Sequence, residues 1–410
     1  MKRLLLPLGV AIAMLIVPGV TLAESPPFEF KKDDRAVLIG GTMIEREQES
    51  GYIETRLSCH FPDRSFTFRN LGWSGDTVEG ISQAGFGSVE DGFKHLVSHI
   101  LALKPTVLIL GYGANEAYEG KVGLPKFLKG LDRLLKAIEP TGARLIFLSP
   151  TRQEDLGPPL PDPRAHNADL ALYRDALKLE AEKRGARFID LFAMIPDGAK
   201  ASPRLPLTSN GLHYTPYGYW RLAAAVEEGL FPSPKPPSNG EPVEHPVGFS
   251  QVASELGKIP GGYRLRDYKL NRLPAPIPPD GGPTLPLDGY KFRVWDLEPG
   301  RYTFKVDGQT FASTDARGWG AGVVVRKGPE FDQVEALRQA IIAKNQLYFY
   351  RWRPQNETYL FGFRKHEQGQ NAREIPQFDP LIAAREAEIF RLRQRVPHTY
   401  ELIREGEVGK

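Results

Sequence analysis

The sequence predicts an α/β protein built on a parallel sheet, and three observations lead to that prediction. Between residues 35 and 230, short apolar runs alternate with longer amphipathic stretches, as buried strands separated by helices do. Glycine-containing segments directly follow three of the apolar runs. After residue 230 a proline-rich stretch ends this pattern and shorter segments follow. We therefore expect a doubly wound domain followed by a C-terminal region of another kind.

The elements of the predicted doubly wound domain can be named one by one. Each strand is a run of four or five residues in which apolar and β-branched side chains dominate, and each helix is a longer stretch with helical spacing. Strands are predicted at residues 36–39, 65–69, 106–110, 144–148 and 187–191. Helices are predicted at residues 92–103, 124–138, 170–184 and 215–230.

Beyond residue 230 the chain contains two proline-rich stretches, with short strands and two helices predicted after residue 286. Residues 231–246 and 273–286 are proline-rich, which is typical of linkers and extended surface chain. Asp307-Gly308 is a hairpin signal between two alternating segments. Strands are predicted at residues 290–295, 300–306 and 309–313, and helices at 331–345 and 379–395.

An aromatic and basic stretch, residues 347–378, separates the last two predicted helices. We expect its side chains to form a stacked and solvated cover on the core. The alternative is that its arginines and aromatic rings bind an anionic or sugar ligand.

The first 23 residues have the parts of a secretory signal peptide. Lys2 and Arg3 precede an apolar run from Leu4 to Val17, and Thr21-Leu22-Ala23 is an acceptable cleavage site. An uncleaved N-terminal anchor is the alternative, although prolines interrupt the run and it is short for a membrane span. Cleavage would place the protein in the periplasm, the cell envelope or the medium.

Composition excludes several classes of function. The 410 residues carry a net charge of +3, which becomes +1 (3 − 2) without Lys2 and Arg3. So small an excess of positive charge does not indicate a protein that binds the phosphates of nucleic acid. Cys59 is the only cysteine, so an intrachain disulfide is impossible, and the sequence holds no Cys/His metal cluster. We therefore predict no cofactor, no metal and no nucleic-acid partner, and no membrane span after the leader.

The three glycine-containing segments predict a site at one edge of the sheet. They are Gly40-Gly41-Thr42, Trp73-Ser74-Gly75-Asp76 and residues 111–116, and each comes just after a predicted strand. Ligands of open α/β sheets bind outside the carboxyl ends of the strands, so these segments should converge. Their glycines permit tight turns and close approach of the chain to a ligand.

The polar groups of these segments suit stabilisation of negative charge. The backbone N–H groups of Thr42 and Gly75 and the side-chain amide of Asn115 are three donors that could form an oxyanion hole. His213 lies just before the last helix of the domain and could act as a general base. For Thr42, the alternative is a helix N-cap whose hydroxyl only satisfies backbone donors. For His213, it is a buried, hydrogen-bonded histidine.

These segments, in this order, resemble the conserved blocks of the SGNH (GDSL-type) hydrolases over about residues 35–230. Thr42 occupies the position of the family's nucleophilic serine, Gly75 that of the block II glycine and Asn115 that of the block III asparagine. The last block, Asp-x-x-His in the family, is Asn210-Gly211-Leu212-His213 here. The resemblance implies a flavodoxin-like three-layer sandwich with ester hydrolysis at its site.

In the roles that the resemblance implies, Thr42, His213 and Asn210 are catalytic. Two of these three depart from the family pattern. Threonine has a usable hydroxyl, but its methyl group restricts the rotamers. Asparagine cannot stabilise an imidazolium as a carboxylate does, and such a change in a comparable triad costs about 10⁴ in turnover.

Other groups near the same segments could take part in catalysis. Asp76 and Glu116 are nearby carboxylates that could be recruited. Ser74 and Ser209 are possible substitute nucleophiles.

The amino-acid sequence of this core also resembles that of a subgroup of SGNH-like proteins found beside large secreted or membrane-attached multidomain chains. Residues 350–358 and 361–367 are similar to the companion segment of that subgroup. The resemblance assigns that segment no role.

The sequence thus leads to four expected segments: a signal peptide (1–23), an SGNH-like domain (33–232), a proline-rich linker (233–286) and a C-terminal β-hairpin plus helical region (287–410). The leading hypothesis is a secreted esterase acting on a small-molecule or glycan ester, such as the O-acyl group of a carbohydrate. One alternative is a catalytically inactive fold that binds a glycan or a partner protein in the cell envelope. Another is a scaffold within a larger envelope assembly. The oligomeric state stays open.

Overall fold

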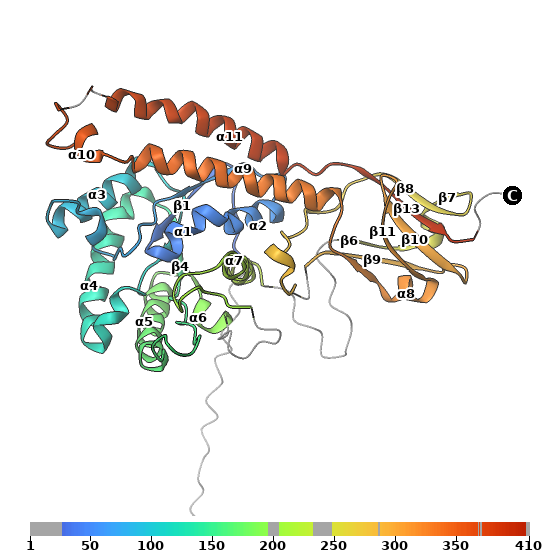
Figure 1. Ribbon diagram of the computed structural model, residues 1–410, viewed down its shortest axis with the longest axis horizontal. Helices are drawn as coiled ribbons and strands as arrows, with labels where there is room; N and C mark the ends of the chain where they lie inside the picture. The colour runs from blue at the N-terminus through green and yellow to red at the C-terminus, as the bar shows by residue number, and fades with distance from the viewer. Residues whose placement is uncertain are drawn as a thin grey trace, which may run out of the picture.

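The computed structural model describes residues 27–195, 205–232, 248–285, 288–367, 369 and 371–406. The predicted signal peptide and the proline-rich residues 233–247 lie outside them. Two parts stand side by side, a parallel sheet covered by helices and a β-rich part, and the long helix α9 (Pro329–Trp352) begins beside the β-rich part and runs along the first part (Figure 1).

The first part is built on a five-stranded sheet with the order β2-β1-β3-β4-β5, in which all neighbours are parallel. This order is that of a flavodoxin-like doubly wound fold. Its strands are β1 (Asp34–Gly40), β2 (Phe66–Asn70), β3 (Val107–Gly111), β4 (Arg144–Leu148) and β5 (Arg187–Ile189). All five predicted strands are confirmed, with ends that differ by two residues at most.

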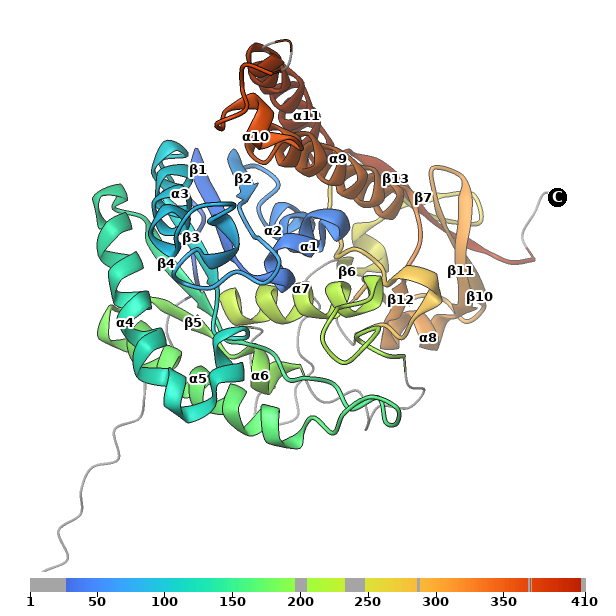
Figure 2. The same cartoon turned by 60° about the vertical axis from the view of Figure 1, so that its left-hand side comes forward.

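Helices cover both faces of this sheet (Figure 2). Val37 and Ile39 of β1 pack on one face, and Ala36 and Leu38 on the other, as strand alternation requires. The first face is covered by α3 (Val89–Ala102), α4 (Gly120–Ile138) and α5 (Arg164–Lys183). The second is covered by α1 (Thr42–Ser50), α2 (Tyr52–His60), the short α6 (Leu191–Met194) and α7 (Pro216–Leu230). The predicted α/β class is confirmed.

The second part contains two further sheets that share one core. One has the order β11-β10-β13-β8-β7 and the other β12-β9-β6. Phe292 comes from β9 of one sheet, whereas Phe304 and Tyr400 come from β10 and β13 of the other. The three rings pack in the same aromatic core. The strands are β6 (Gly248–Val252), β7 (Gly257–Ile259), β8 (Gly262–Tyr268), β9 (Tyr290–Trp295), β10 (Arg301–Val306), β11 (Gln309–Asp315), β12 (Val323–Val325) and β13 (His398–Arg404), with the short helix α8 (Ala316–Ala321).

One prediction for this region is wrong: residues 248–268, placed in the linker, form β6, β7 and β8. The predicted hairpin is confirmed as β10 and β11, and helices α9 and α11 follow it. The prediction missed β13, which returns at the end of the described chain between β10 and β8. Strands β8 and β13 pair with each other from far apart in the chain, which local pattern does not reveal.

Helix α9 lies on the first part, and α11 (Phe378–Leu392) packs along it, with the short helix α10 (Glu357–Leu360) between them. The ammonium group of Lys344 on α9 is buried and lies 2.6 Å from a carboxylate oxygen of Glu54 on α2. It also donates to the carbonyl of Phe68 at 3.1 Å. A buried ion pair tolerates little displacement, so it fixes where α9 crosses the domain.

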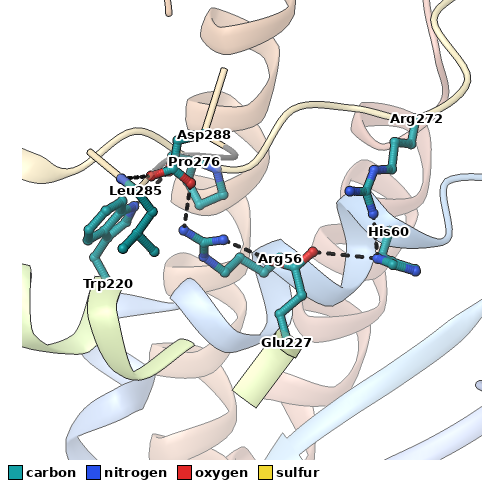
Figure 3. A network of polar contacts seen from close by, with 8 residues as sticks. All are labelled: Arg56, His60, Trp220, Glu227, Arg272, Pro276, Leu285 and Asp288. Atoms are coloured by element: carbon teal, nitrogen blue, oxygen red, sulfur yellow. Dashed lines mark hydrogen bonds and ion pairs between the residues drawn. The ribbon is translucent and has the colours of Figure 1, made fainter. Parts of the chain in front are cut away.

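A second buried network joins α2 and α7 to the segment between β8 and β9 (Figure 3). The guanidinium of Arg56 lies 2.8 Å from Glu227 and 3.4 Å from Asp288, and Trp220 donates to the carbonyl of Pro276 at 2.7 Å. Burial opposes the charge on Glu227, but the hydrogen bond with His60 and the charge of Arg56 outweigh it and lower the pKa of Glu227 to about 2.

The first testable prediction concerns Glu227. Glu227→Gln should lower the free energy of unfolding by about 3–5 kcal/mol, because it leaves the Arg56 charge buried without its main partner. Since the folded pKa is lowered, this contribution is present above about pH 4.5 in the natural chain and is lost as the pH falls toward 2. Urea unfolding at several pH values measures both effects. Glu228→Gln, at the exposed neighbouring residue, is the control and should change stability little; an equal loss in both variants would contradict the prediction.

Candidate active site

A cavity of about 110 Å³ opens at the carboxyl edge of the parallel sheet. Thr42, Asn115 and His213 line it, although they come from three distant segments. The other two predicted site residues adjoin these: Gly75 donates its backbone N–H to Thr42, and Asn210 contacts His213. The structure therefore brings all five predicted residues to one place.

Close contacts between backbones explain the glycines that surround the cavity. A Cβ at Gly40 would stand 2.5 Å from the carbonyl oxygen of Gly111, so the ends of β1 and β3 approach as near as glycine allows. A Cβ at Gly72 would stand 2.3 Å from the backbone nitrogen of Glu45. The loop after β2 can therefore lie directly on α1, which brings Gly75 against Thr42.

Thr42 is the first residue of α1, and its N-cap is Gly41. The Thr42 hydroxyl oxygen accepts the backbone N–H of Gly75 at 3.2 Å, so the side chain reaches across the cavity edge rather than capping its own helix. Thr42 is therefore not the N-cap, although its hydroxyl does accept a backbone donor, as that alternative expected. An N–H donor at the hydroxyl oxygen favours the anionic form of the hydroxyl. The Thr42 N–H belongs to the first helical turn, where amides lack intrahelical partners.

Asn115 offers an amide donor in the lining of the same cavity. Its side-chain nitrogen donates to the carbonyl of Asp76 at 2.6 Å, which fixes the orientation of the amide. The amide carries two N–H groups, so the second remains for a ligand in the cavity that Asn115 lines. A Cβ at Gly41 would stand 2.8 Å from this nitrogen, which is why the turn before Thr42 needs glycine there.

The contact between Asn210 and His213 sets the state of the imidazole. The side-chain oxygen of Asn210 accepts the backbone N–H groups of Leu212 at 3.2 Å and His213 at 2.9 Å. The amide is therefore oriented, and its nitrogen faces Nδ1 of His213 at 3.2 Å. Because that nitrogen only donates, Nδ1 must accept, and the neutral ring carries its proton on Nε2. An aspartate would select the opposite tautomer.

Burial and the charge of Arg46 lower the pKa of His213, so the ring is neutral at pH 7. In this state Nε2 is a hydrogen-bond donor and cannot accept a proton. His213 becomes a general base only after its proton moves to Nδ1, which sacrifices the hydrogen bond from Asn210.

Two carboxylates line the cavity and hold the loops around it. Glu116 accepts the backbone N–H groups of Val78 and Gly113, each at 2.9 Å, and burial raises its pKa to about 7. Asp76 accepts from the backbone of Ser82 at 3.0 Å and from Gln83 at 2.8 Å, and burial raises its pKa as well. Their oxygens are thus used to connect the segments after β2 and β3.

The two substitute nucleophiles stand apart from this cavity. Ser74 lines a separate groove between α1 and α9. The hydroxyl of Ser209 contacts the carbonyl of His213 at 3.4 Å.

Sequence reasoning missed an aromatic pair at the cavity. The rings of Tyr118 and His166 stack with centroids 4.1 Å apart and planes 18° apart, and both residues line the cavity. Tyr118 remains 62% exposed. The available signal was its position in the turn directly after Asn115 and Glu116, but a lone tyrosine in a sequence does not indicate that a second ring backs it.

Comparison with protein families agrees with this geometry. Residues 41–221 match the GDSL-like lipase/acylhydrolase family. This segment of the chain belongs to that family. It begins one residue before Thr42 and ends in α7, so it includes all the residues of the candidate site. Lipases and acylhydrolases, from which the family takes its name, act on ester bonds, and the matched segment is similar to them.

The chain is also similar to solved structures. BT4096, a gut microbial diltiazem-metabolizing enzyme, is 15% identical with a TM-score of 0.66, over 92% of this chain and 99% of that chain. LAE5, an α/β hydrolase enzyme from the metagenome of Lake Arreo, Spain, is 22% identical (TM-score 0.38) over 49% of this chain and 96% of its own. A catalytic mutant of Axe2, an acetylxylan esterase from Geobacillus stearothermophilus, is 16% identical (TM-score 0.38), also over 49% and 96%.

A search of the curated proteins finds no match. The likeness to BT4096 shows that the combination of the GDSL-like part with the β-rich part and α9 is a fold that another protein shares. Within the described ranges, no group of three or more histidine, cysteine or acidic residues is arranged to hold a metal ion. The helices of the same ranges include none with the length and apolar character of a membrane span.

The second testable prediction concerns the tautomer of His213. Asn210→Asp should move the neutral-ring proton from Nε2 to Nδ1 and raise the pKa of His213, because a carboxylate then faces Nδ1. Nitrogen-15 NMR of the histidine ring measures both. Ser209→Asp adds a carboxylate one residue away and is the control, which should leave the tautomer unchanged. An Nδ1 proton in the natural chain would contradict this account of the site.

Proposed function

We propose that this protein hydrolyses carboxylic esters with Thr42 as its nucleophile. The observation that carries the proposal is the pairing of Thr42 with Gly75 in a cavity that Asn115 and His213 also line. A hydroxyl, a histidine and several converging N–H donors are the groups that acyl transfer to a side-chain oxygen needs.

The proposed reaction has two steps. The Thr42 oxygen bonds to the ester carbonyl carbon while its proton passes to Nε2 of His213 in the Nδ1-protonated tautomer. The carbonyl oxygen becomes an oxyanion held by Gly75, Asn115 and the backbone N–H of Thr42. The bond to the alcohol then breaks, and His213 returns the proton to the leaving alcohol. Water releases the acid from acyl-Thr42 in the same manner.

We further propose that the alcohol is a carbohydrate and that the protein works outside the cytoplasm. The stacked Tyr118 and His166 support the first point, because an exposed ring beside the cavity offers a flat face for a sugar. The predicted signal peptide, residues 1–23, supports the second.

A second candidate function is ligand binding without turnover in the same cavity. The observation that favours it is the hydrogen bond from Asn210, which holds His213 in the tautomer that cannot accept a proton at Nε2. Calorimetry against acetylated glycans would detect it, and absence of both binding and hydrolysis would exclude both candidates for those ligands.

The third testable prediction concerns the nucleophile and the base. Thr42→Ala and His213→Ala should abolish hydrolysis of short-chain p-nitrophenyl esters and acetylated sugars, whereas Thr42→Ser should retain it. Asn210→Asp should raise kcat by up to about 10⁴, because it supplies the tautomer that catalysis uses. Thr310→Ala, at an exposed threonine of β11, is the control and should change nothing.

The outcomes of this experiment separate the two candidates. Activity in the natural chain that survives Thr42→Ala would contradict the proposed nucleophile. No activity in the natural chain, together with activity in the Thr42→Ser/Asn210→Asp variant, would favour the binding function.

The fourth testable prediction concerns the sugar platform. Tyr118→Ala should raise KM for acetylated oligosaccharides roughly 2- to 12-fold, which corresponds to about 0.5–1.5 kcal/mol of stacking. Tyr118→Phe keeps the ring and should keep KM. Hydrolysis of p-nitrophenyl acetate is the matched control, since its alcohol is not a sugar. An equal change for both substrates would contradict a sugar-binding role.

A further inference from the structure

Glu45 connects the candidate site to the C-terminal region. It lies in the first turn of α1, three residues after Thr42. One of its carboxylate oxygens accepts the backbone N–H of Ser74 at 2.6 Å, and the other lies 2.6 Å from the guanidinium of Arg353. Both oxygens of one side chain are thus held, one by the loop after β2 and one by the residue that follows α9.

Arg353 is itself fixed by aromatic rings. Its guanidinium carbon lies 3.5 Å from the centre of the Trp73 ring, and Trp352 meets the same ring edge-on at 5.7 Å. Only 26% of the Arg353 side chain and 13% of the Glu45 side chain are exposed. The ion pair is therefore sheltered from solvent and stronger than a surface pair. The end of α9 holds Trp73 and, through Glu45, Ser74.

The loop tip is also closed by a turn bond from the backbone N–H of Asp76 to the carbonyl of Trp73 at 2.9 Å. Ser74 and Gly75 are exposed, and Gly75 has a positive φ of 77°. A Cβ at Gly75 would meet, within 4 Å, a single atom, the hydroxyl oxygen of Ser82 at 3.3 Å. Beyond this turn, the peptide between Ser74 and Gly75 is held by the bond to Glu45 on one side and the bond to Thr42 on the other.

We propose that Arg353 is a positioning residue for ester hydrolysis. Through Glu45 it fixes the Ser74-Gly75 turn, and so it places the Gly75 N–H where the oxyanion forms. This inference rests on the proposed function. It gives the C-terminal region a role in catalysis: α9, anchored by Lys344 and Glu54, delivers an arginine to a loop of the GDSL-like part.

The size of the expected effect follows from the donor that Arg353 positions. Removing one oxyanion donor outright costs about 10²–10³ in kcat. Releasing the loop displaces that donor without deleting it, so the loss should be smaller, roughly 10- to 100-fold. The loss should fall on kcat rather than KM, because the donor acts on charge that develops in the transition state.

The first experiment measures kcat and KM of the full chain for p-nitrophenyl acetate. Arg353→Ala should lower kcat roughly 10- to 100-fold with KM little changed, and added guanidinium chloride at millimolar concentration should restore part of it. Arg353→Lys keeps a charge for Glu45 and should lose less. Arg351→Ala is the matched control, since Arg351 lies on α9 and pairs with Asp379 at 2.8 Å instead. Unchanged kcat in Arg353→Ala, or equal loss in Arg351→Ala, would overturn the proposal.

The second experiment does not depend on turnover. Hydrogen exchange of residues 73–77 should become faster in Arg353→Ala, while exchange in residues 36–39 of β1 should not change. If the natural chain proves inactive, the proposed function fails, and this experiment still decides whether Arg353 fixes the loop. Exchange in residues 73–77 that matches the natural chain would overturn the positioning role whatever the activity.

Discussion

The candidate site depends on the close approach of β1 and β3 at their carboxyl ends. Gly40 lies so near the carbonyl of Gly111 that a side chain would not fit between them. This contact sets where β1 ends and α1 begins, so it places Thr42 opposite the segment that carries Asn115. Once the two strand ends are fixed, the segments that carry the N–H donors around Thr42 start from the same edge of the sheet, and contacts such as the one between Glu45 and Ser74 then hold the individual loops.

Local pattern predicted the parts of the fold that local forces determine. Residues 144–148 and 290–295 were predicted to the residue, because each is a continuous or alternating run with no competing signal. Strands β6 to β8 were missed, because they lie among prolines and β8 pairs with β13 more than 130 positions further along, Gly262 with Ile403. The same distinction holds at the site. Thr42, Gly75 and Asn115 could be found from glycines after strands, whereas the bond from Arg353 to Glu45 spans 308 positions.

Buried charges give the C-terminal region a fixed position on the GDSL-like part. Lys344 is buried against Glu54, and Arg56 is buried between Glu227 and Asp288. Such pairs contribute little net stability, but a displaced partner leaves an uncompensated charge in the interior, so they favour one arrangement over sliding alternatives. An arginine at the end of α9 can therefore act on a loop near Thr42, because the helix that carries it is held at a defined place.

The departure at Asn210 changes the chemistry of the site more than its shape. Asparagine and aspartate share the oxygen that accepts the backbone N–H groups of Leu212 and His213, so the turn before α7 is the same with either. They differ in the atom that faces Nδ1, where a donor replaces an acceptor. An ester could therefore be bound and oriented as in a carboxylate-containing relative, while the proton transfer that follows would be slower. The side-chain oxygen of Asn210 holds the backbone of the turn, and so it preserves the shape of the cavity for binding. The side-chain nitrogen of Asn210 faces Nδ1, and so this one atom slows the proton transfer that turnover requires.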